Sequence, residues 1–170
     1  MYALIRFFAE LCLLRRAPQD LPASTTLLGV ALAADLLVGG AVGLAIDLPL
    51  AMALAEGVVD VVFTLGVLYL ALRLLDRLPR FQQTATALLG AGALIGLVAF
   101  LPLSLLPSGQ PSQQSALAGL LFLALIVWSI LVTGHILRHA FDLRLAQGVV
   151  IAIVYNLLAY HLISGVFGEA

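Results

Sequence analysis

Hydrophobic positions along the chain form five long blocks separated by short polar joints. The blocks cover residues 25–46, 49–75, 84–106, 116–137 and 143–167. A helix that crosses the hydrocarbon core of a bilayer needs about 20 apolar residues, and each block meets that length. Because backbone polar groups must be satisfied within such a segment, the pattern predicts an all-α polytopic membrane protein with five transmembrane helices.

The joints contain residues that begin and end helices. Ser24 is placed to cap the first span, Asp47 marks a very short turn before the second span, and Asp142 is placed to cap the last. The joint at 107–115, PSGQPSQQS, is polar and rich in turn formers. Short joints make successive helices antiparallel neighbours, so we expect residues 24–170 to form one five-helix transmembrane domain.

Residues 1–23 form a cytoplasmic N-terminal helix and linker in this interpretation. The stretch YALIRFFAELCLL is interrupted by Arg6 and Glu10, and no small-residue cleavage site follows it, so we expect it to be retained. A helix here puts these two charges on one face, largely opposite Leu4, Phe7, Phe8 and Leu11. Two arrangements stay open, which are a helix lying in the membrane interface and a helix packed on the bundle.

Composition supports a membrane protein and excludes several other classes. Hydrophobic residues make up 63% of the chain and charged residues only 10%, whereas soluble domains carry about 25% charged residues. The single cysteine, Cys12, excludes an internal disulfide framework. The formal net charge of −1 gives no basic field for nucleic acid.

All eight basic residues are arginines, and they fall in three packets. The packets lie before the first span, at the joint of spans two and three, and at the joint of spans four and five: Arg6, Arg15, Arg16, Arg73, Arg77, Arg80, Arg138 and Arg144. Five crossings place all three packets on one side of the membrane, which the positive-inside rule makes the cytoplasm. We therefore expect a cytoplasmic N-terminus and an external C-terminus. Part of this set is expected to meet anionic headgroups or a partner, namely Arg15, Arg16, Arg73, Arg77, Arg80 and Arg138.

Ionisable residues inside the spans are candidate functional residues, because charge in hydrocarbon is costly. Asp35 and Asp60 each lie about 15 Å along their helices, near the bilayer midplane. Glu56 precedes Asp60 by one turn on the same helix face, and Asn156 and His161 lie in the fifth span. These five residues are the candidate intramembrane polar cluster.

Two interpretations of this cluster stay open. Either it forms a proton or cation site, or its acids remain neutral and act as structural contacts. In the second case they hydrogen-bond between helices, each worth about 1 kcal/mol or less, or border a water-lined cleft. The three acids do not match a recognised metal-ligand spacing. No phosphate loop, nucleophile elbow or paired acid–base constellation is visible, so we expect no enzyme activity, no metal and no cofactor.

Small residues provide a second pattern. GxxxG pairs at Gly39 and Gly43 and at Gly92 and Gly96 let helices approach closely, and packing within the chain is favoured over dimerisation. Pro102 predicts a kink in the third span.

Histidines and aromatic residues also occur within the spans. His135 and His139 flank Arg138, and an interfacial basic cluster facing headgroups is favoured over a metal pair. Trp128 lies mid-span and is expected to pack between helices. Tyr155 and Tyr160 are expected to line a polar cleft or to hydrogen-bond across helices.

Three stretches resemble the Yip domain family, the membrane proteins named for interaction with Ypt/Rab GTPases. LRRAPQDLPAS is similar to the family's pre-membrane segment, and ALRLLDRLPRFQQTATALLGAGALIGLVAFLPL to its second-to-third-span hairpin. LALIVWSILVTGHILRHAFDLRLAQGVVIAIV is similar to its fourth-to-fifth-span signature. The resemblance implies a five-pass fold without catalytic residues. Its eukaryotic members act in vesicle traffic through a long cytoplasmic N-terminal region, so Rab binding is not expected of this short form.

The sequence therefore favours a non-enzymatic membrane-organising or protein-interaction role. Its expected partners are lipids and other membrane proteins or further copies of itself. The alternative is a small oligomeric transporter or channel for protons, cations or a small solute. The use of arginine without lysine and the compact form resemble a bacterial protein with GC-rich coding, so we expect the bacterial inner membrane.

The predicted topology is tested by reporter fusions. A reporter fused after Ala170 is expected to be active only in its periplasmic form, because five crossings start from a cytoplasmic N-terminus. Paired periplasmic and cytoplasmic reporters at this position provide the measurement. Activity of the cytoplasmic reporter there would contradict the topology.

Overall fold

The computed structural model describes residues 2–104 and 113–168, and it confirms the predicted fold class. Five of its helices are long and apolar enough to cross a membrane: α2 (Thr25–Ala45), α3 (Leu50–Leu74), α4 (Phe81–Ser104), α5 (Gln113–Phe141) and α6 (Leu145–Phe167). A short helix, α1 (Tyr2–Cys12), precedes them. The 3-10 turns η1 (Pro18–Asp20) and η2 (Leu78–Arg80) precede α2 and α4.

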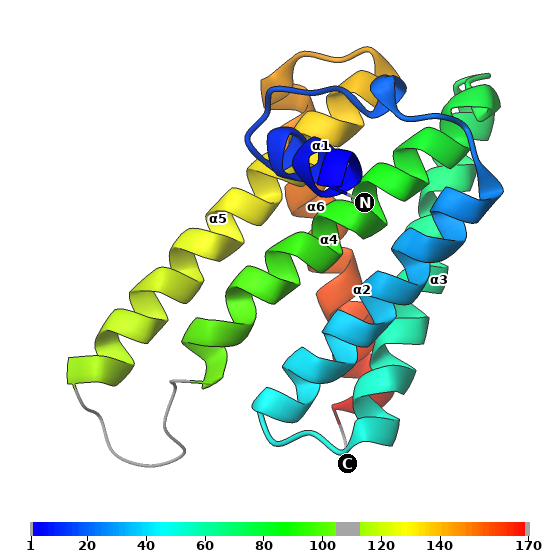
Figure 1. The fold of residues 1–170 in the computed structure, drawn as a ribbon. Helices are drawn as coiled ribbons and strands as arrows, with labels where there is room; N and C mark the ends of the chain where they lie inside the picture. Colours follow the sequence, from blue (N-terminus) through cyan, green and yellow to red (C-terminus); the bar gives the residue numbers. More distant parts are fainter. Residues whose placement is uncertain (1, 105–112, 169–170) are drawn as a thin grey trace.

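The five long helices run alternately up and down and close a ring (Figure 1). Contacts join α2 to α3, α3 to α6, α6 to α5, α5 to α4 and α4 back to α2. Helix α4 also contacts α1 and α3, and 44% of its span is buried, against 11–17% for the other spans. Its small residues permit neighbours on several sides, since Thr84, Ala85, Thr86, Ala87, Gly90 and Ala91 are all buried.

Helix boundaries differ from the predicted spans mainly at α4 and α5. Helix α4 begins at Phe81 rather than at residue 84, and α5 continues to Phe141, beyond the predicted end at Leu137. The added turn of α5 includes Arg138 and His139, and basic side chains are favourable at a helix C-terminus. Most of the joint predicted at 107–115 lies outside the described residues, as do the predicted end of the third span at residue 106 and the last two residues of the tail.

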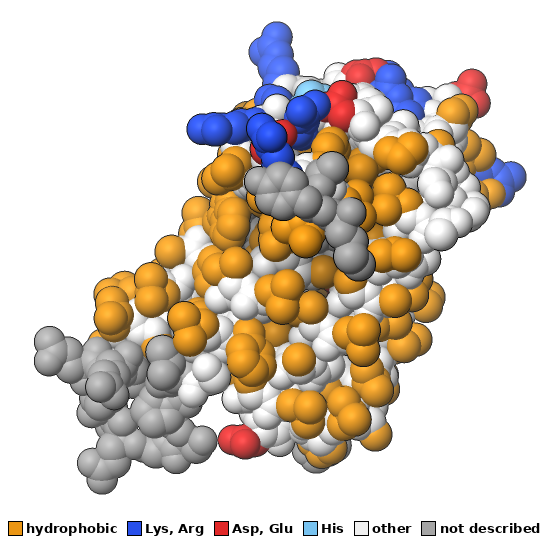
Figure 2. Space-filling model, viewed as in Figure 1, with side chains coloured by type: hydrophobic (Ala, Val, Ile, Leu, Met, Phe, Trp, Pro, Cys, Tyr) orange, Lys and Arg blue, Asp and Glu red, His pale blue; other side chains and the backbone are white. Residues whose placement is uncertain are grey.

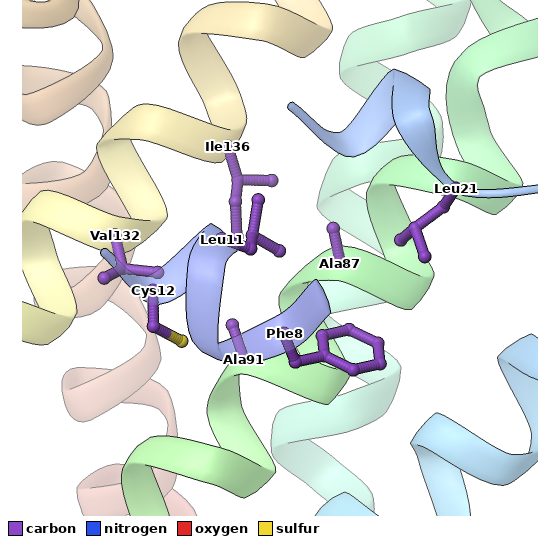
Figure 3. Close-up of a cluster of buried hydrophobic side chains, with 8 residues drawn as sticks. All are labelled: Phe8, Leu11, Cys12, Leu21, Ala87, Ala91, Val132 and Ile136. Carbon is purple, nitrogen blue, oxygen red and sulfur yellow. The ribbon is translucent and has the colours of Figure 1, made fainter. Parts of the chain in front are cut away.

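Helix α1 packs on the bundle, which is the second of the two arrangements left open by the sequence. Its Leu11 and Cys12 are buried between α4 and α5 (Figure 3). Phe8 lies against Gly90 so closely that a Cβ atom on that glycine would overlap the phenyl ring. The predicted charged face is confirmed, because Arg6 Nε donates to Glu10 Oε1 at 2.9 Å.

The segment between α1 and α2 is held along α5 and α4 by hydrogen bonds to its backbone. Trp128 Nε1 donates to the Cys12 carbonyl at 2.8 Å, and His135 Nε2 lies 2.8 Å from the Arg16 carbonyl. The side-chain amide of Gln83 donates to the Leu21 carbonyl at 2.6 Å. Because each partner side chain belongs to a transmembrane helix, the segment is fixed to the bundle along its length.

Four helices end in the same left-handed turn. Leu14, Asp47, Asp76 and Asp142 have φ angles of 53–64°, and each follows the final turn of a helix. In each case the next N–H bonds to a carbonyl five residues earlier, as in Arg77 N to Leu72 O at 2.7 Å. This is the Schellman geometry, which usually has glycine at the left-handed position. Aspartate tolerates this conformation better than most residues, which explains why it occurs in all three described joints between spans.

The arginines lie at one end of the bundle, where α2, α4 and α6 begin and α3 and α5 end (Figure 2). Two joints are clamped together there by Asp142, which accepts hydrogen bonds from Arg77 and, at 2.9 Å, from Arg80. The Arg80 guanidinium holds the pKa of the Asp142 carboxyl below its usual value.

The prediction that Asp142 caps α6 is wrong, because Arg144 occupies the N-cap and its N–H donates to the Gln147 side chain.

The left-handed turns are tested at Asp76, which is exposed. Asp76→Gly is expected to raise the free energy of unfolding by up to about 1 kcal/mol, because glycine adopts positive φ without a steric cost. Asp76→Val is expected to lower it by about 1–2 kcal/mol, because a β-branched residue resists this conformation. Denaturant titration in detergent micelles measures both changes. Equal stability of the two variants would show that the turn imposes no conformational cost.

Candidate functional site

A polar cavity of about 180 Å³ lies inside the ring, and all five transmembrane helices line it. Seven polar side chains contribute to its wall: Asp35, Asp60, Thr64, Ser129, Thr133, Tyr155 and Asn156. Apolar residues such as Leu89, Ile95 and Ile136 complete it. The described lining contains no arginine or histidine, so its two carboxyl groups have no basic partner there.

The cavity lies half-way along the bundle. Asp35 is the central residue of α2 and Asn156 is the central residue of α6. Asp60, Gly92 and Ser129 lie close to the middle of α3, α4 and α5. Both aspartates thus lie near the middle of their helices.

Asp35 and Asp60 both line the cavity, from the neighbouring helices α2 and α3. Within the described residues, neither aspartate hydrogen-bonds to another side chain. Gly92 provides the room for Asp35, because a Cβ atom on this glycine would lie 2.7 Å from Asp35 Oδ1. The predicted packing of Gly92 and Gly96 within the chain is confirmed, since Gly96 likewise faces Val38.

One part of the cavity wall is held by a hydroxyl pair. The Tyr155 hydroxyl and the Thr64 hydroxyl share a hydrogen bond between α6 and α3. The Tyr155 ring stacks on Phe63 with centroids 5.8 Å apart. Thr64 follows Asp60 by one helical turn, so the bond fixes the α3 face that carries the carboxyl group. Tyr155 both lines the cleft and bonds across helices, as the sequence predicts, whereas Tyr160 is exposed on α6 and the prediction for it is wrong.

Three of the five residues in the predicted polar cluster come together at the cavity. They are Asp35, Asp60 and Asn156, whose side-chain nitrogen donates to the Ala152 carbonyl at 2.8 Å. Glu56 and His161 do not line it. Glu56 is displaced one turn along α3, and His161 is exposed on the outside of α6 beside Tyr160.

Three of the cavity's hydroxyl groups were not among the predicted site residues. Ser129 and Thr133 are one turn apart on α5, just as Asp60 and Thr64 are on α3. The sequence contains an indication of this, because polar residues at i,i+4 spacing near mid-span lie on one face of a helix. The indication is ambiguous, because a hydroxyl in a transmembrane helix can also bond to its own backbone, as Ser129 does to the Ile126 carbonyl at 2.8 Å.

One of the two histidines of α5 departs from its predicted role. His135 is only 2% exposed and binds the Arg16 carbonyl, so the prediction that it faces headgroups is wrong. The physical reason is the covering N-terminal segment, which removes this face of α5 from the membrane surface. His139 packs edge-on against His135, with ring centroids 4.8 Å apart. Among the described residues no group of three or more His, Cys, Asp or Glu side chains could hold a metal ion.

The predicted arginine face divides into paired and exposed members. Arg16 pairs with Glu10 at 2.9 Å, and Arg77 and Arg80 pair with Asp142. Arg15 and Arg73 are exposed. Arg138 is partly buried, and its Nε atom has no hydrogen-bond partner in the described part of the chain.

Comparison with models of known protein families, with curated proteins and with solved structures finds no match. The function is therefore inferred from the geometry of the cavity and from the placement of charge.

The close approach of Asp35 to α4 is tested by Gly92→Ala, with Gly66→Ala on α3 as its matched control. The Gly92 variant is expected to lower the free energy of unfolding by about 1–3 kcal/mol, because the new methyl group displaces the carboxyl. A Cβ atom at Gly66 meets nothing within 4 Å, so the control is expected to be neutral or up to about 1 kcal/mol more stable. In the background of Asp35→Ala, Gly92→Ala is expected to lower the free energy of unfolding no further, because the carboxyl is absent. An equal loss of stability in that background would contradict the contact between Gly92 and Asp35.

Proposed function

We propose that this polytopic membrane protein binds a small cation in the cavity between Asp35 and Asp60 and carries it across the membrane. The observation that supports the proposal is the pairing of two carboxyl groups in one cavity without a basic residue in its described lining. Two like charges at bilayer depth are costly, and a bound cation or proton relieves that cost.

The chemistry of the lining favours a cation over other small solutes. Its polar groups are carboxyl, hydroxyl and amide groups, and the oxygen atoms of these groups attract positive charge. The arginines lie at the end of the bundle rather than at its middle, so they do not neutralise the site. The cavity therefore combines acceptor oxygens with uncompensated negative charge.

The alternative interpretation, in which the acids act only as helix contacts, has less support. A structural contact requires a hydrogen bond from each acid to a neighbouring helix. Within the described residues Asp35 and Asp60 make no such side-chain bond, whereas Tyr155 and Thr64 do. The Thr64–Tyr155 pair thus provides the bond between helices, and the carboxyl groups of Asp35 and Asp60 can bind a ligand.

A membrane-organising role is a second candidate, and the arginine-rich end favours it. Arg15, Arg73 and Arg144 are exposed there and are suited to anionic headgroups or an acidic partner. We place this end in the cytoplasm by the positive-inside rule, in a bacterial inner membrane. Membership of the Yip domain family and a non-enzymatic role are part of this proposal, and they depend on the sequence resemblance and on the absence of catalytic motifs.

Transport is tested as exchange of an external cation, Na⁺, K⁺ or tetramethylammonium, for an internal proton, in proteoliposomes with a trapped pH dye that reports the loss of the proton. At least one cation is expected to produce a flux that Asp35→Asn and Asp60→Asn each reduce by about tenfold or more, because each removes a charge that pairs with the ligand. Glu56→Gln is the matched control on α3 and is expected to retain the flux. Folded variants with unchanged flux, or no flux of any cation in the wild type, would contradict the proposal.

A further inference from the structure

A second cavity of about 70 Å³ adjoins the polar one, and its wall is almost entirely carbon. Thr64, Leu88, Thr133 and Tyr155 line both spaces. The Thr64–Tyr155 hydrogen bond therefore lies at the boundary between a region with two carboxyl groups and a region with none. Two spaces of opposite chemistry thus meet at one shared wall in the middle of the bundle.

The apolar cavity extends from this boundary toward the arginine-rich end. On α3 its lining continues from Thr64 to Leu68 and Ala71, and on α5 from Thr133 to Leu137 and Phe141. Three of its lining residues, Leu68, Leu137 and Phe141, belong to a buried hydrophobic cluster that also includes Leu72, Ala85 and Ala140. The cavity is therefore backed by packed side chains on the side away from the acids.

The same helix face of α3 changes character along its length. Its successive i,i+4 positions are Glu56, Asp60, Thr64, Leu68 and Leu72. Acids occupy the half distant from the arginines, a hydroxyl lies at the boundary, and buried leucines follow. A ligand that contacts this face at mid-depth therefore meets charge at one end and hydrocarbon at the other.

We infer that the ligand is an amphipathic organic cation, whose ammonium group lies between Asp35 and Asp60 and whose short alkyl tail occupies the apolar cavity. The inference rests on the proposed function, because it names the substrate class of the same site. An inorganic cation uses only the polar space and leaves the adjoining carbon-lined space without a role. The stacked rings of Tyr155 and Phe63 stand beside the polar space, and aromatic rings of this kind stabilise alkylammonium groups.

The tail is expected to add affinity in proportion to its length. Each methylene that moves from water into an apolar cavity contributes about fourfold to the binding constant. Butyltrimethylammonium is therefore expected to bind at least about tenfold more tightly than tetramethylammonium, which has the same charge but no tail. Isothermal titration of the purified protein in detergent measures both constants. Titration of Asp60→Asn corrects for partition of the probes into micelles.

Filling the apolar cavity provides the decisive variant. Ala71→Leu and Ala71→Phe are expected to reduce the ratio of the two binding constants toward one, because the added side chain occupies the space of the tail. Ala33→Phe, on the exposed face of α2, is the matched control and is expected to leave the ratio unchanged. Thermal unfolding shows which variants are folded. If Ala71→Phe does not fold, the ratio of the two binding constants is measured with the smaller Ala71→Leu substitution.

The outcomes separate this inference from the proposed function. Equal binding of the two probes by the wild type, or a ratio that folded Ala71 variants retain, overturns the amphipathic ligand. If neither probe binds, the amphipathic-ligand inference is also overturned. In that case an Asp60-dependent flux of Na⁺ or K⁺ would still support the proposed cation site. If no cation flux depends on Asp35 and Asp60, the proposed function itself fails.

Discussion

The structure depends on one constraint, which is that polar side chains at the middle of a membrane-spanning helix are more stable facing protein than facing lipid. The five-helix ring satisfies it by turning one mid-helix face of every span inward. Asp35, Asp60, Thr64, Tyr155 and Asn156 share a cavity for this reason, while large apolar residues such as Leu37, Val62 and Leu157 cover the outside. Hydrophobic burial contributes little to association between helices in lipid, so close packing has a large share. The small residues of α4 supply that packing.

Most charged side chains outside the spans lie near the ends of the helices. Arginines gather at one end of the bundle, and aspartates end the helices in the described joints. At Asp142 the two features combine, because a residue in a left-handed turn also receives Arg77 and Arg80 from the neighbouring joint. One short polar segment thereby ends α5 and ties the α3–α4 joint to the α5–α6 joint.

The number of spans, their antiparallel order and the mid-helix positions of Asp35 and Asp60 were predictable, because hydrocarbon thickness fixes helix length and helical rise fixes where a residue lies along the helix. The site was predictable only in part. Sequence periodicity shows where a residue lies along a helix and which residues share its face. It does not show which face turns toward the inside of the ring, because that rotation depends on the packing of all neighbouring helices. Glu56 and Asp60 share a face of α3, yet only Asp60 lines the cavity. His135 is covered by residues more than a hundred positions away in sequence, which no local pattern encodes.

The position of α1 has a consequence for the order in which the protein assembles during synthesis. Trp128, His135 and the backbone of His139 are separated from their partners Cys12, Arg16 and Gln19 by 116, 119 and 120 residues. Residues 12–19 are synthesised well before α5, so these contacts form only after α5 has emerged from the ribosome. Until then Leu11 lacks the α5 members of its buried cluster, Val132 and Ile136, whereas Phe8 can already pack against Gly90 once α4 has formed.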